Sequence, residues 1–246
     1  MNTIQLCFDP GLAGFFRIRP RFRYILDRRS SIKDIIEAQG VPHTEVGLIL
    51  ADGCRAGFEL IPVPGQRISV FQVRAPLDPT RPDRLRPEPF PELRFLVDLN
   101  VGRLAGLLRG LGYDVLYDPD MDDQAMALTA QKDKRVVLSR DRGLLKRRLI
   151  QYGRLVRADR PADQFKEVAS LFGLESSRMF TRCLGCNSRL VRVDKEKILH
   201  RLEPGTRRYF DRFTMCLECD QIYWAGTHLE KFQKRLKMAG ILRESA

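Results

Sequence analysis

The sequence predicts an α/β protein in three parts, with a parallel sheet in the middle. Strand-like and helix-like segments alternate strictly from Arg94 to about Leu174, which is typical of a parallel sheet covered by helices. A stretch rich in proline, from Ala75 to Leu93, separates this part from a smaller β-rich domain before it. Two Cys-x-x-Cys pairs follow the alternating part and indicate a small module held by a metal ion.

The first part, residues 1–77, has the element order of a β-grasp domain. Its only predicted helix follows a serine, Ser30 or Ser31, that can cap it, and Gly40 stands where the helix would end. Two strands precede this helix and two follow it. The predicted elements are strands Thr3–Phe8 and Phe22–Leu26, helix Ile32–Ala38, and strands Glu45–Leu50 and Ile68–Val73.

This first part resembles the ubiquitin-like sulfur-carrier family that includes the small subunit of molybdopterin synthase. The matching stretches run from Thr44 to Gly53 and from Pro64 to Phe71. Those carriers act through a free C-terminal Gly-Gly, whereas this segment continues through Val73 into the prolines. We therefore do not expect sulfur transfer. An interaction or RNA-positioning role, and a plain folding appendage, both remain open.

Residues 78–92 form the predicted linker. Proline lacks the backbone N–H that helices and sheets need, and at this density it favours a stiff, extended chain. The sequence therefore predicts a spacer with a domain on either side.

The central part, residues 93–175, contains four predicted helices. The first follows Asp98 and ends at Gly112, and the second follows Asp122. The third spans about Gly143–Gln151, and the fourth runs from Pro161 to just before Gly173. On the first helix, three glycines recur every fourth residue and predict close approach to a neighbouring backbone. They are Gly102, Gly106 and Gly110.

Aspartates end four apolar runs of the central and following segments, at Asp98, Asp118, Asp141 and Asp159. The carboxyl ends of parallel strands meet at one sheet edge, where open α/β folds bind ligands. Carboxylates gathered there repel one another unless a cation lies among them. The candidate catalytic set is Asp98, Asp122, Asp123, Asp141 and Asp159. Asp118 ranks lower, and Asp122 alone would be interpreted as a helix N-cap.

Two other acidic α/β sites fit less well. A receiver-type phosphorylation site requires adjacent acids after the first strand, but Leu99-Asn100 follow Asp98. A phosphatase of the haloacid class requires Asp-x-Asp, which Asn100 breaks. The pattern therefore favours metal-assisted cleavage of a phosphodiester.

The chain carries a formal net charge of +12, which favours a phosphate-rich partner. Basic residues border Asp141, and they would hold an RNA backbone that the carboxylates themselves repel. A solvated helix face is the alternative interpretation. The predicted RNA-binding residues are Arg140, Arg142, Lys146, Arg147 and, near the C-terminus, His228. For His228 a purely structural role is the stronger alternative.

The last part, residues 176–246, combines both cysteine pairs with a basic terminal helix from about His228 to Ala239. Four thiolates match the closed tetrahedral set of structural zinc, and neither pair opens a helix as a redox motif would. We therefore predict a zinc ribbon. Its ligands are Cys183, Cys186, Cys216 and Cys219.

Several separated stretches carry a resemblance to one nuclease family. They are Phe95–Asp98, Leu107–Val115, Asp122-Asp123, Arg135–Arg142, Cys183–Asn187 and Tyr223–His228. With them, Arg94 to Asp159 resembles the PIN-like nuclease fold. Together with the ribbon it resembles the family named for the C-terminal ribonuclease domain of the Mut-seven exonuclease.

The resemblance implies a Mg²⁺- or Mn²⁺-dependent ribonuclease with Asp98, Asp123 and Asp141 as metal ligands. Asp122 and Asp159 are additional candidates. This family often follows its double acid with a glutamate, where this chain has Gln124, so the ligands of a second metal stay open. Some relatives also carry the N-terminal β-grasp domain.

The expected protein is thus an α/β, PIN-like nuclease with an N-terminal β-grasp domain and a C-terminal zinc ribbon. We expect RNA as its partner, no membrane association and a cytoplasmic location, because no signal peptide or long apolar run is present. The alternatives are a non-catalytic RNA-binding protein and an adaptor that binds a protein partner through the β-grasp domain. The sequence leaves open the RNA target, endo- or exonuclease action, the number of catalytic metals and the oligomeric state.

Overall fold

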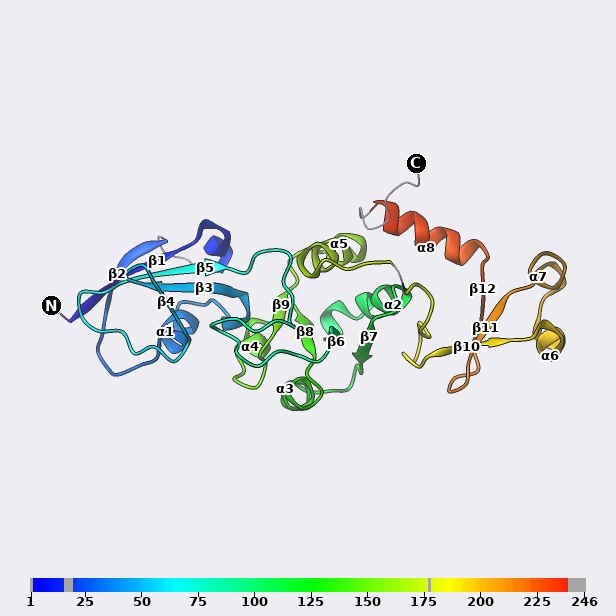
Figure 1. Cartoon of the computed structure of the whole chain (residues 1–246), viewed down its shortest axis with the longest axis horizontal. Coiled ribbons are helices and arrows are strands. Elements are labelled where there is room, and N and C mark those ends of the chain that lie inside the picture. Colours follow the sequence, from blue (N-terminus) through cyan, green and yellow to red (C-terminus); the bar gives the residue numbers. More distant parts are fainter. Residues whose placement is uncertain (1, 16–19, 177, 239–246) are drawn as a thin grey trace.

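A computed structural model describes residues 2–15, 20–176 and 178–238 of the chain. The three predicted parts follow one another along the long axis, with the N-terminal domain at one end, the parallel sheet in the middle and the ribbon at the other end (Figure 1). The terminal helix α8 (Thr227–Met238) turns back from the ribbon toward the central domain. None of the described helices is long and apolar enough to cross a membrane.

The N-terminal domain has the predicted β-grasp architecture, a five-stranded mixed sheet packed on one helix. Its strand order is β2-β1-β5-β3-β4, in which β1 and β5 run parallel and the other pairs run antiparallel. Ser31 caps the helix by accepting a hydrogen bond from the backbone N–H of Asp34, as predicted. The short strand β4 was not predicted. The elements are β1 (Thr3–Phe8), η1 (Pro10–Phe15), β2 (Arg21–Ile25), α1 (Ile32–Ala38), η2 (His43–Glu45), β3 (Val46–Ala51), β4 (Cys54–Ala56) and β5 (Arg67–Gln72).

The central sheet has four strands in the order β7-β6-β8-β9, and every neighbouring pair is parallel. This confirms the predicted parallel α/β sheet. Its residues alternate between two cores, as the two-residue period of a strand requires. Leu96 and Val137 face α3, α4 and the N-terminal domain, whereas Phe95 and Leu138 face α2 and α5. The strands are β6 (Arg94–Val97), β7 (Asp114–Tyr117), β8 (Val136–Ser139) and β9 (Gly153–Leu155).

The helices of the central domain begin and end mostly where the sequence predicts. Gly112, with a left-handed φ of 92°, follows the end of the first, and Gly173, with φ 60°, caps the last. The third helix is much shorter than predicted, because α4 ends at Leu145 and an irregular segment leads from there to β9. The elements are η3 (Leu99–Val101), α2 (Arg103–Gly110), α3 (Asp123–Lys132), α4 (Arg142–Leu145) and α5 (Pro161–Phe172).

The proline-rich segment, residues 78–92, contains neither helix nor strand, but it does not act as a spacer. Leu85, Arg86 and Phe90 are buried. The Arg86 guanidinium donates hydrogen bonds to backbone oxygens of Val46 (2.9 Å) in the N-terminal domain and Gln151 (3.2 Å) in the central domain. The predicted extended spacer is therefore wrong in one respect: its side chains fill the junction, so the two domains share one core.

The glycine row of α2 contacts mainly side chains, where the sequence predicted a backbone. A Cβ added at Gly110 would lie 2.5 Å from the ring of Phe232 in α8, and one at Gly102 would lie 2.6 Å from the Tyr117 hydroxyl. Only Gly106 faces a backbone atom, the Leu184 oxygen at 4.0 Å. The row therefore makes room for aromatic rings, because a flat ring can approach a helix only where no Cβ projects.

The ribbon is a three-stranded antiparallel sheet in the order β10-β11-β12. Two short helices, α6 and α7, connect β10 to β11. A small core joins Ile198 of α6 and Leu202 of the same connection to Phe213 and Ile222 of the sheet. The elements are β10 (Leu190–Val193), α6 (Lys195–Ile198), η4 (Leu199–Arg201), α7 (Pro204–Tyr209), β11 (Phe213–Cys216) and β12 (Ile222–Trp224).

Candidate functional site

The carboxyl edge of the central sheet contains the point where strand order reverses. From β6 the chain passes to β7 on one side and then crosses to β8 on the other. The parallel neighbours β6 and β8 are therefore followed by connections that lead to opposite edges of the sheet. Such a reversal separates the segments that leave the two strands and opens a crevice for ligands. Asp98 follows β6, and Ser139-Arg140-Asp141 leave β8, so this crevice brings together the two best-supported aspartates.

Ser139 joins the two aspartates through its hydroxyl. Its Oγ donates a 2.5 Å hydrogen bond to Oδ2 of Asp98 and accepts a 2.8 Å bond from the backbone N–H of Asp141. Asn100 fixes the same pair of strand ends, since its Nδ2 donates to Asp98 Oδ2 (2.6 Å) and its Oδ1 accepts from the backbone N–H of Arg140 (2.9 Å). The position of Asp98 is therefore set by two neutral donors.

Asp141 also caps helix α4. Its Oδ1 accepts hydrogen bonds from the backbone N–H groups of Gly143 (2.6 Å) and Leu144 (3.4 Å). Oδ1 of Asp98 and Oδ2 of Asp141 receive no hydrogen bond from the described residues. Each of the two carboxylates thus keeps one oxygen that can bind a cation.

The remaining predicted acids have structural partners. Asp122 is the N-cap of α3 and accepts from Ala125 N (2.7 Å). Asp123 lies in the first turn, 3.5 Å from the Arg147 guanidinium. Asp159, mostly exposed, pairs with Arg140 at 2.7 Å. Asp118, ranked low in the sequence, accepts from the N–H of Asp120 in a turn.

The structure does not gather Asp98, Asp123 and Asp141 into a closed metal cage. Within the described ranges, the four cysteines are the one group of three or more acidic, histidine or cysteine side chains with donor atoms within 4.8 Å of one another. Asp98 and Asp141 are linked through Ser139, whereas Asp123 is drawn to Arg147. The acidic set is thus an open site with two aspartates at its centre.

A groove of about 520 Å³ lies beside Asp98 at this edge of the sheet. Arg103 lines it, is exposed, and makes no ion pair with the described residues, so its charge is available to a ligand. The groove also reaches Asp159 and the start of α5. Its full lining is Leu99, Asn100, Val101, Gly102, Arg103, Tyr117, Asp159, Pro161 and Gln164.

The predicted RNA-binding cations are largely engaged by the protein itself. Arg142 donates to the backbone oxygen of Gly14 (3.1 Å), and its guanidinium lies 5.1 Å from the centre of the Phe15 ring. Lys146 Nζ donates to the Glu37 oxygen in α1 (2.6 Å). Arg142 and Lys146 therefore bind the N-terminal domain, where the sequence predicted a free basic rim. Arg140 and Arg147 pair with acids as given above, and the His228 side chain lies outside the described residues.

The four cysteines form one cluster, as predicted, and two similar turns hold them there. Asn187 in the first and Asp220 in the second adopt left-handed backbone angles (φ 73° and 60°), and each donates its N–H to the first cysteine of its pair. Sulfur atoms of Cys183 and Cys219 lie 3.4 Å apart, and those of Cys186 and Cys216 lie 3.3 Å apart. Four sulfurs this close can hold one metal ion.

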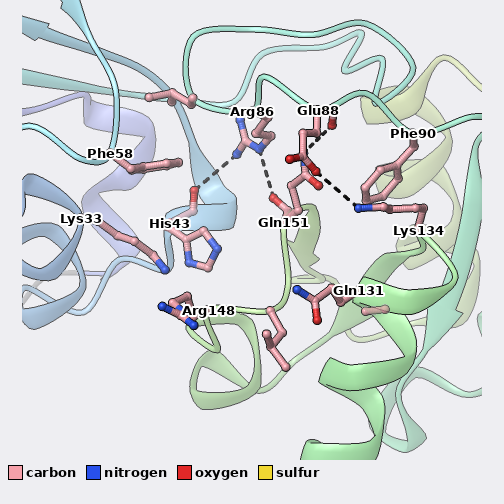
Figure 2. A pocket seen from close by; sticks show the side chains of 13 residues that line it. Lys33, His43, Phe58, Arg86, Glu88, Phe90, Gln131, Lys134, Arg148 and Gln151 are labelled. Atoms are coloured by element: carbon pink, nitrogen blue, oxygen red, sulfur yellow. Dashed lines mark hydrogen bonds and ion pairs between the residues drawn. The ribbon is translucent and has the colours of Figure 1, made fainter.

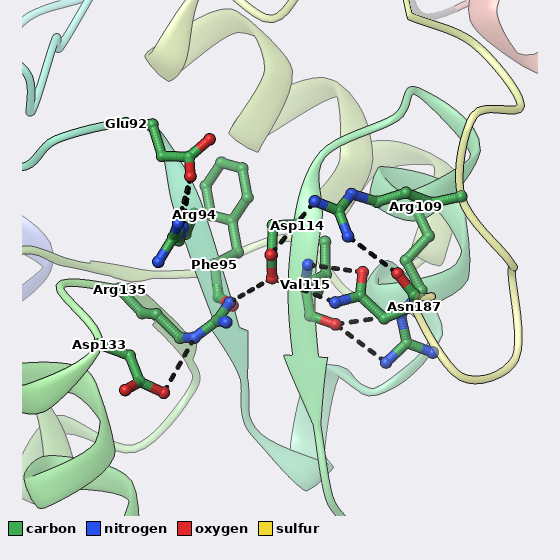
Figure 3. Close-up of polar contacts among 10 residues, drawn as sticks. Glu92, Arg94, Phe95, Arg109, Asp114, Val115, Asp133, Arg135 and Asn187 are labelled. Atoms are coloured by element: carbon green, nitrogen blue, oxygen red, sulfur yellow. Dashed lines mark hydrogen bonds and ion pairs between the residues drawn. The ribbon is translucent and has the colours of Figure 1, made fainter. Parts of the chain in front are cut away.

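Side chains at the outer strand β7 attach the ribbon to the central domain (Figure 3). The Arg109 guanidinium donates to the oxygens of Val115, Leu184 and Gly185, the last two in the first cysteine turn. Asn187 of the same turn accepts from Val115 N (2.9 Å) and donates to Asp114 (3.1 Å). The cysteine turn is therefore fixed to the sheet by both backbone and side-chain hydrogen bonds.

Sequence reasoning missed the positioning residues of both sites. Asn100, Ser139, Arg109 and Asn187 all stood within stretches quoted for the resemblance or the alternatives, without a role. A polar residue at the end of a buried strand was the available signal for Ser139, since it needs a partner when buried. Nothing in the sequence marked Arg86, one of many arginines in the chain.

Models of known families match two segments of the chain. The Mut7-C RNAse domain matches residues 93–236, and the Mut7-C ubiquitin domain matches residues 1–78. No curated protein and no solved structure matches. The first match covers more than half of the sequence, contains both the acidic edge and the cysteine cluster, and agrees with the resemblance drawn from the motifs. The chain belongs to the Mut7-C RNAse domain family, with a Mut7-C ubiquitin domain before it.

Proposed function

We propose that this protein is a metal-dependent ribonuclease that hydrolyses RNA phosphodiesters at the carboxyl edge of its central sheet. The observation that carries the proposal is the pair Asp98 and Asp141, linked by Ser139 at the strand-order reversal. Each of them keeps one oxygen that no donor among the described residues contacts. The family match supports the same class of activity.

The donor set fits a hard cation such as Mg²⁺ or Mn²⁺, because both free ligand atoms are carboxylate oxygens. A cation at this position would activate water and neutralise charge that builds on the phosphate. Asp98 and Asp141 are the proposed ligands, with Asp123 as the third and Asp122 and Asp159 as outer candidates. Binding of Asp123 requires its carboxylate to leave Arg147, and the exposure of both side chains makes this exchange inexpensive.

The protein's own groups position the RNA. Ser139 and Asn100 hold Asp98, while Arg103 in the adjacent groove offers a free positive charge to the backbone of a bound strand. Arg140 forms an ion pair with Asp159, which lines the same groove. Arg103 thus takes over part of the role that the sequence gave to Arg142 and Lys146.

Asp98→Asn and Asp141→Asn are expected to lower the rate of RNA cleavage in Mg²⁺ or Mn²⁺ by about 100-fold or more, as loss of a group that stabilises charge at a reacting phosphate does. The measurement is cleavage of end-labelled RNA by the purified full chain. Asp118→Asn is the matched control, a strand-end aspartate that only accepts a turn hydrogen bond. Equal cleavage by all three variants would show that the acidic edge is not the catalytic site.

The alternative function is RNA binding without cleavage. It predicts that Mg²⁺ or Mn²⁺ leaves the thermal stability unchanged, whereas a site that binds a cation in the folded state gains stability as the cation concentration rises. A melting temperature that rises with Mn²⁺ in the wild type and stays constant in Asp98→Asn would favour the ribonuclease.

We also propose that the four cysteines hold structural zinc, because an all-thiolate set with all four positions filled leaves no open position for substrate. Metal analysis of the purified protein should find one zinc ion per chain, and Cys216→Ser should lose it. Full zinc content in that variant would refute the assignment.

A further inference from the structure

A second cavity, unrelated to the acidic edge, lies between the N-terminal and central domains (Figure 2). Its volume is about 250 Å³. Lys134 and Gln151, which line it, precede β8 and β9, so the cavity opens at the amino edge of the sheet, opposite to Asp98. It is therefore a separate candidate site.

Four parts of the chain form its walls. Lys33, His43 and Phe58 come from the N-terminal domain. In Figure 2 they face Gln131 of α3 and Lys134, which follows that helix. The proline-rich segment supplies Leu85, Arg86, Glu88 and Phe90, and the loop before β9 supplies Arg148, Leu149 and Gln151. The cavity exists only because the two domains are packed together.

The lining is unevenly charged. Lys33 and Arg148 make no hydrogen bond or ion pair through their side chains with the described residues, whereas Lys134 is paired with the single lining acid, Glu88, at 3.6 Å. Arg86 adds a buried guanidinium whose Nη1 finds no hydrogen-bond acceptor in the described part of the chain, although the Asp83 carboxylate forms an ion pair with it at 3.5 Å. Two uncompensated cations and one unsatisfied donor line a space that also contains the Phe58 ring and two amide side chains.

We propose that this cavity binds a phosphate monoester group attached to a nucleoside, either a free nucleotide or the 5′ end of an RNA. Lys33 and Arg148 supply the charge that a dianionic phosphate requires. Phe58 offers an aromatic face for a base, and Gln131 offers a donor and an acceptor for its edge. Because its contacts come from both domains, such a ligand would bind only their packed arrangement and would stabilise it.

The test is titration calorimetry of the full-length protein with adenosine 5′-monophosphate, without Mg²⁺ or Mn²⁺. We expect saturable binding that weakens about 10-fold or more in the Lys33→Gln/Arg148→Gln double variant, a difference of about 1.4 kcal/mol. The matched control, Arg29→Gln/Lys132→Gln, removes two exposed positive charges that do not line the cavity and should bind within about 2-fold of the wild type. Both double variants carry only exposed or half-buried changes.

Three results would overturn the proposal: no binding, equal weakening in both double variants, or adenosine binding as tightly as its monophosphate. Asp98→Asn should bind like the wild type, and loss of binding in that variant would place the ligand at the acidic edge instead. The outcome is thus independent of whether the protein cleaves RNA. Displacement of the nucleotide by a 5′-phosphorylated oligoribonucleotide, but not by its 5′-hydroxyl form, would identify an RNA end as the ligand, and displacement by neither would identify a free nucleotide.

Discussion

At the scale of single residues, polar side chains hold the candidate site residues in place at both the acidic edge and the cysteine cluster. Ser139 is fully buried and has its hydrogen bonds to both aspartates satisfied, so it fixes their relative position at little cost. Where the ribbon meets the central domain, Asp114 of β7 holds the first cysteine turn through Asn187. Its carboxylate contacts Arg135 (2.6 Å), Asn187 (3.1 Å) and Arg182 (3.2 Å).

The pKa of Asp114 gives a prediction at this scale. Burial alone would raise it, but the hydrogen bond and charge of Arg135, with help from Asn187 and Arg182, lower it below the ordinary value of 3.8. A carboxyl with a lowered pKa in the folded state stabilises the fold above its ordinary pKa, and this contribution is lost as pH falls through the lower folded-state value.

Asp114→Asn is therefore expected to lower the free energy of unfolding at pH 7 by about 2 kcal/mol, since charged hydrogen bonds are lost and two cations stay without their acid. The difference from the wild type should stay constant down to about pH 4 and shrink below it. Urea unfolding at several pH values measures this. Asp211→Asn, at an exposed ion pair, should change stability by about 0.5 kcal/mol or less. A loss in Asp114→Asn that is the same at all pH values would exclude the charged interaction as its cause.

At the scale of elements, helix α8 is positioned by packing against segments that come before the ribbon in sequence. Phe232 and Leu236 of α8 are buried in the core formed by α2 and α5, and the Phe232 ring packs edge-on against Phe180 at 5.1 Å. The ring fits because Gly110 leaves space at the end of α2. The terminal helix therefore belongs to the central domain by packing, although it follows the ribbon in sequence.

Two glycines of α2 allow this contact to be tested. Alanine normally stabilises a helix relative to glycine by about 1 kcal/mol. Gly106→Ala should show this gain, because the nearest atom to its new Cβ is 4.0 Å away. Gly110→Ala should instead destabilise by about 1–3 kcal/mol, since its Cβ would lie 2.5 Å from the Phe232 ring, which is also packed against Phe180. The urea midpoints of the two variants are compared. Equal midpoints would show that α8 can shift away from Gly110 without loss of stability.

At the scale of the whole molecule, the N-terminal domain is packed into one unit with the central domain. Its core continues into the face of the central sheet that carries Leu96 and Val137. Across the same junction, the buried Glu45 accepts hydrogen bonds from Arg154 (2.8 Å) and from the N–H of Leu155 (2.7 Å). A plain appendage would not require these buried polar contacts, because removing Glu45 and Arg154 from water costs free energy.

We therefore expect the two domains to unfold in one cooperative step that depends on Arg86. Arg86→Ala leaves the backbone oxygens of Val46 and Gln151 without their donor and should cost about 3 kcal/mol. Arg84→Ala, two residues away, removes an exposed side chain 3.6 Å from Glu59 and should cost about 0.5 kcal/mol or less. Hydrogen exchange of peptides from β1 and β8 across a urea series measures the step. Separate protection of the two strands in the wild type would contradict one shared unit.

Much of the fold follows from local patterns. The alternation of apolar strands with helices predicted the parallel sheet, and caps such as Ser31, Asp122 and Gly173 placed helix ends within a residue or two. The third helix was predicted too long. Its apolar residues continue past Leu145, but Leu149 and Ile150 pack into the core at the domain junction in an irregular segment. Linker residue Arg86 could not be predicted, since its acceptors lie 40 or more residues away.

The sequence by itself determined the candidate site residues: aspartates that end strands and cysteines paired at metal-binding spacing. Such signals are local, because strand ends and cysteine turns span only a few residues. The tertiary structure alone decided which of them meet. Ser139 joins Asp98 across 41 residues, while Arg142 and Lys146 lie more than 100 residues from the groups they bind and are directed away from the RNA role predicted for them. Contacts at such separations depend on how the domains pack, and packing is a property of the assembled surfaces that no short stretch of sequence contains.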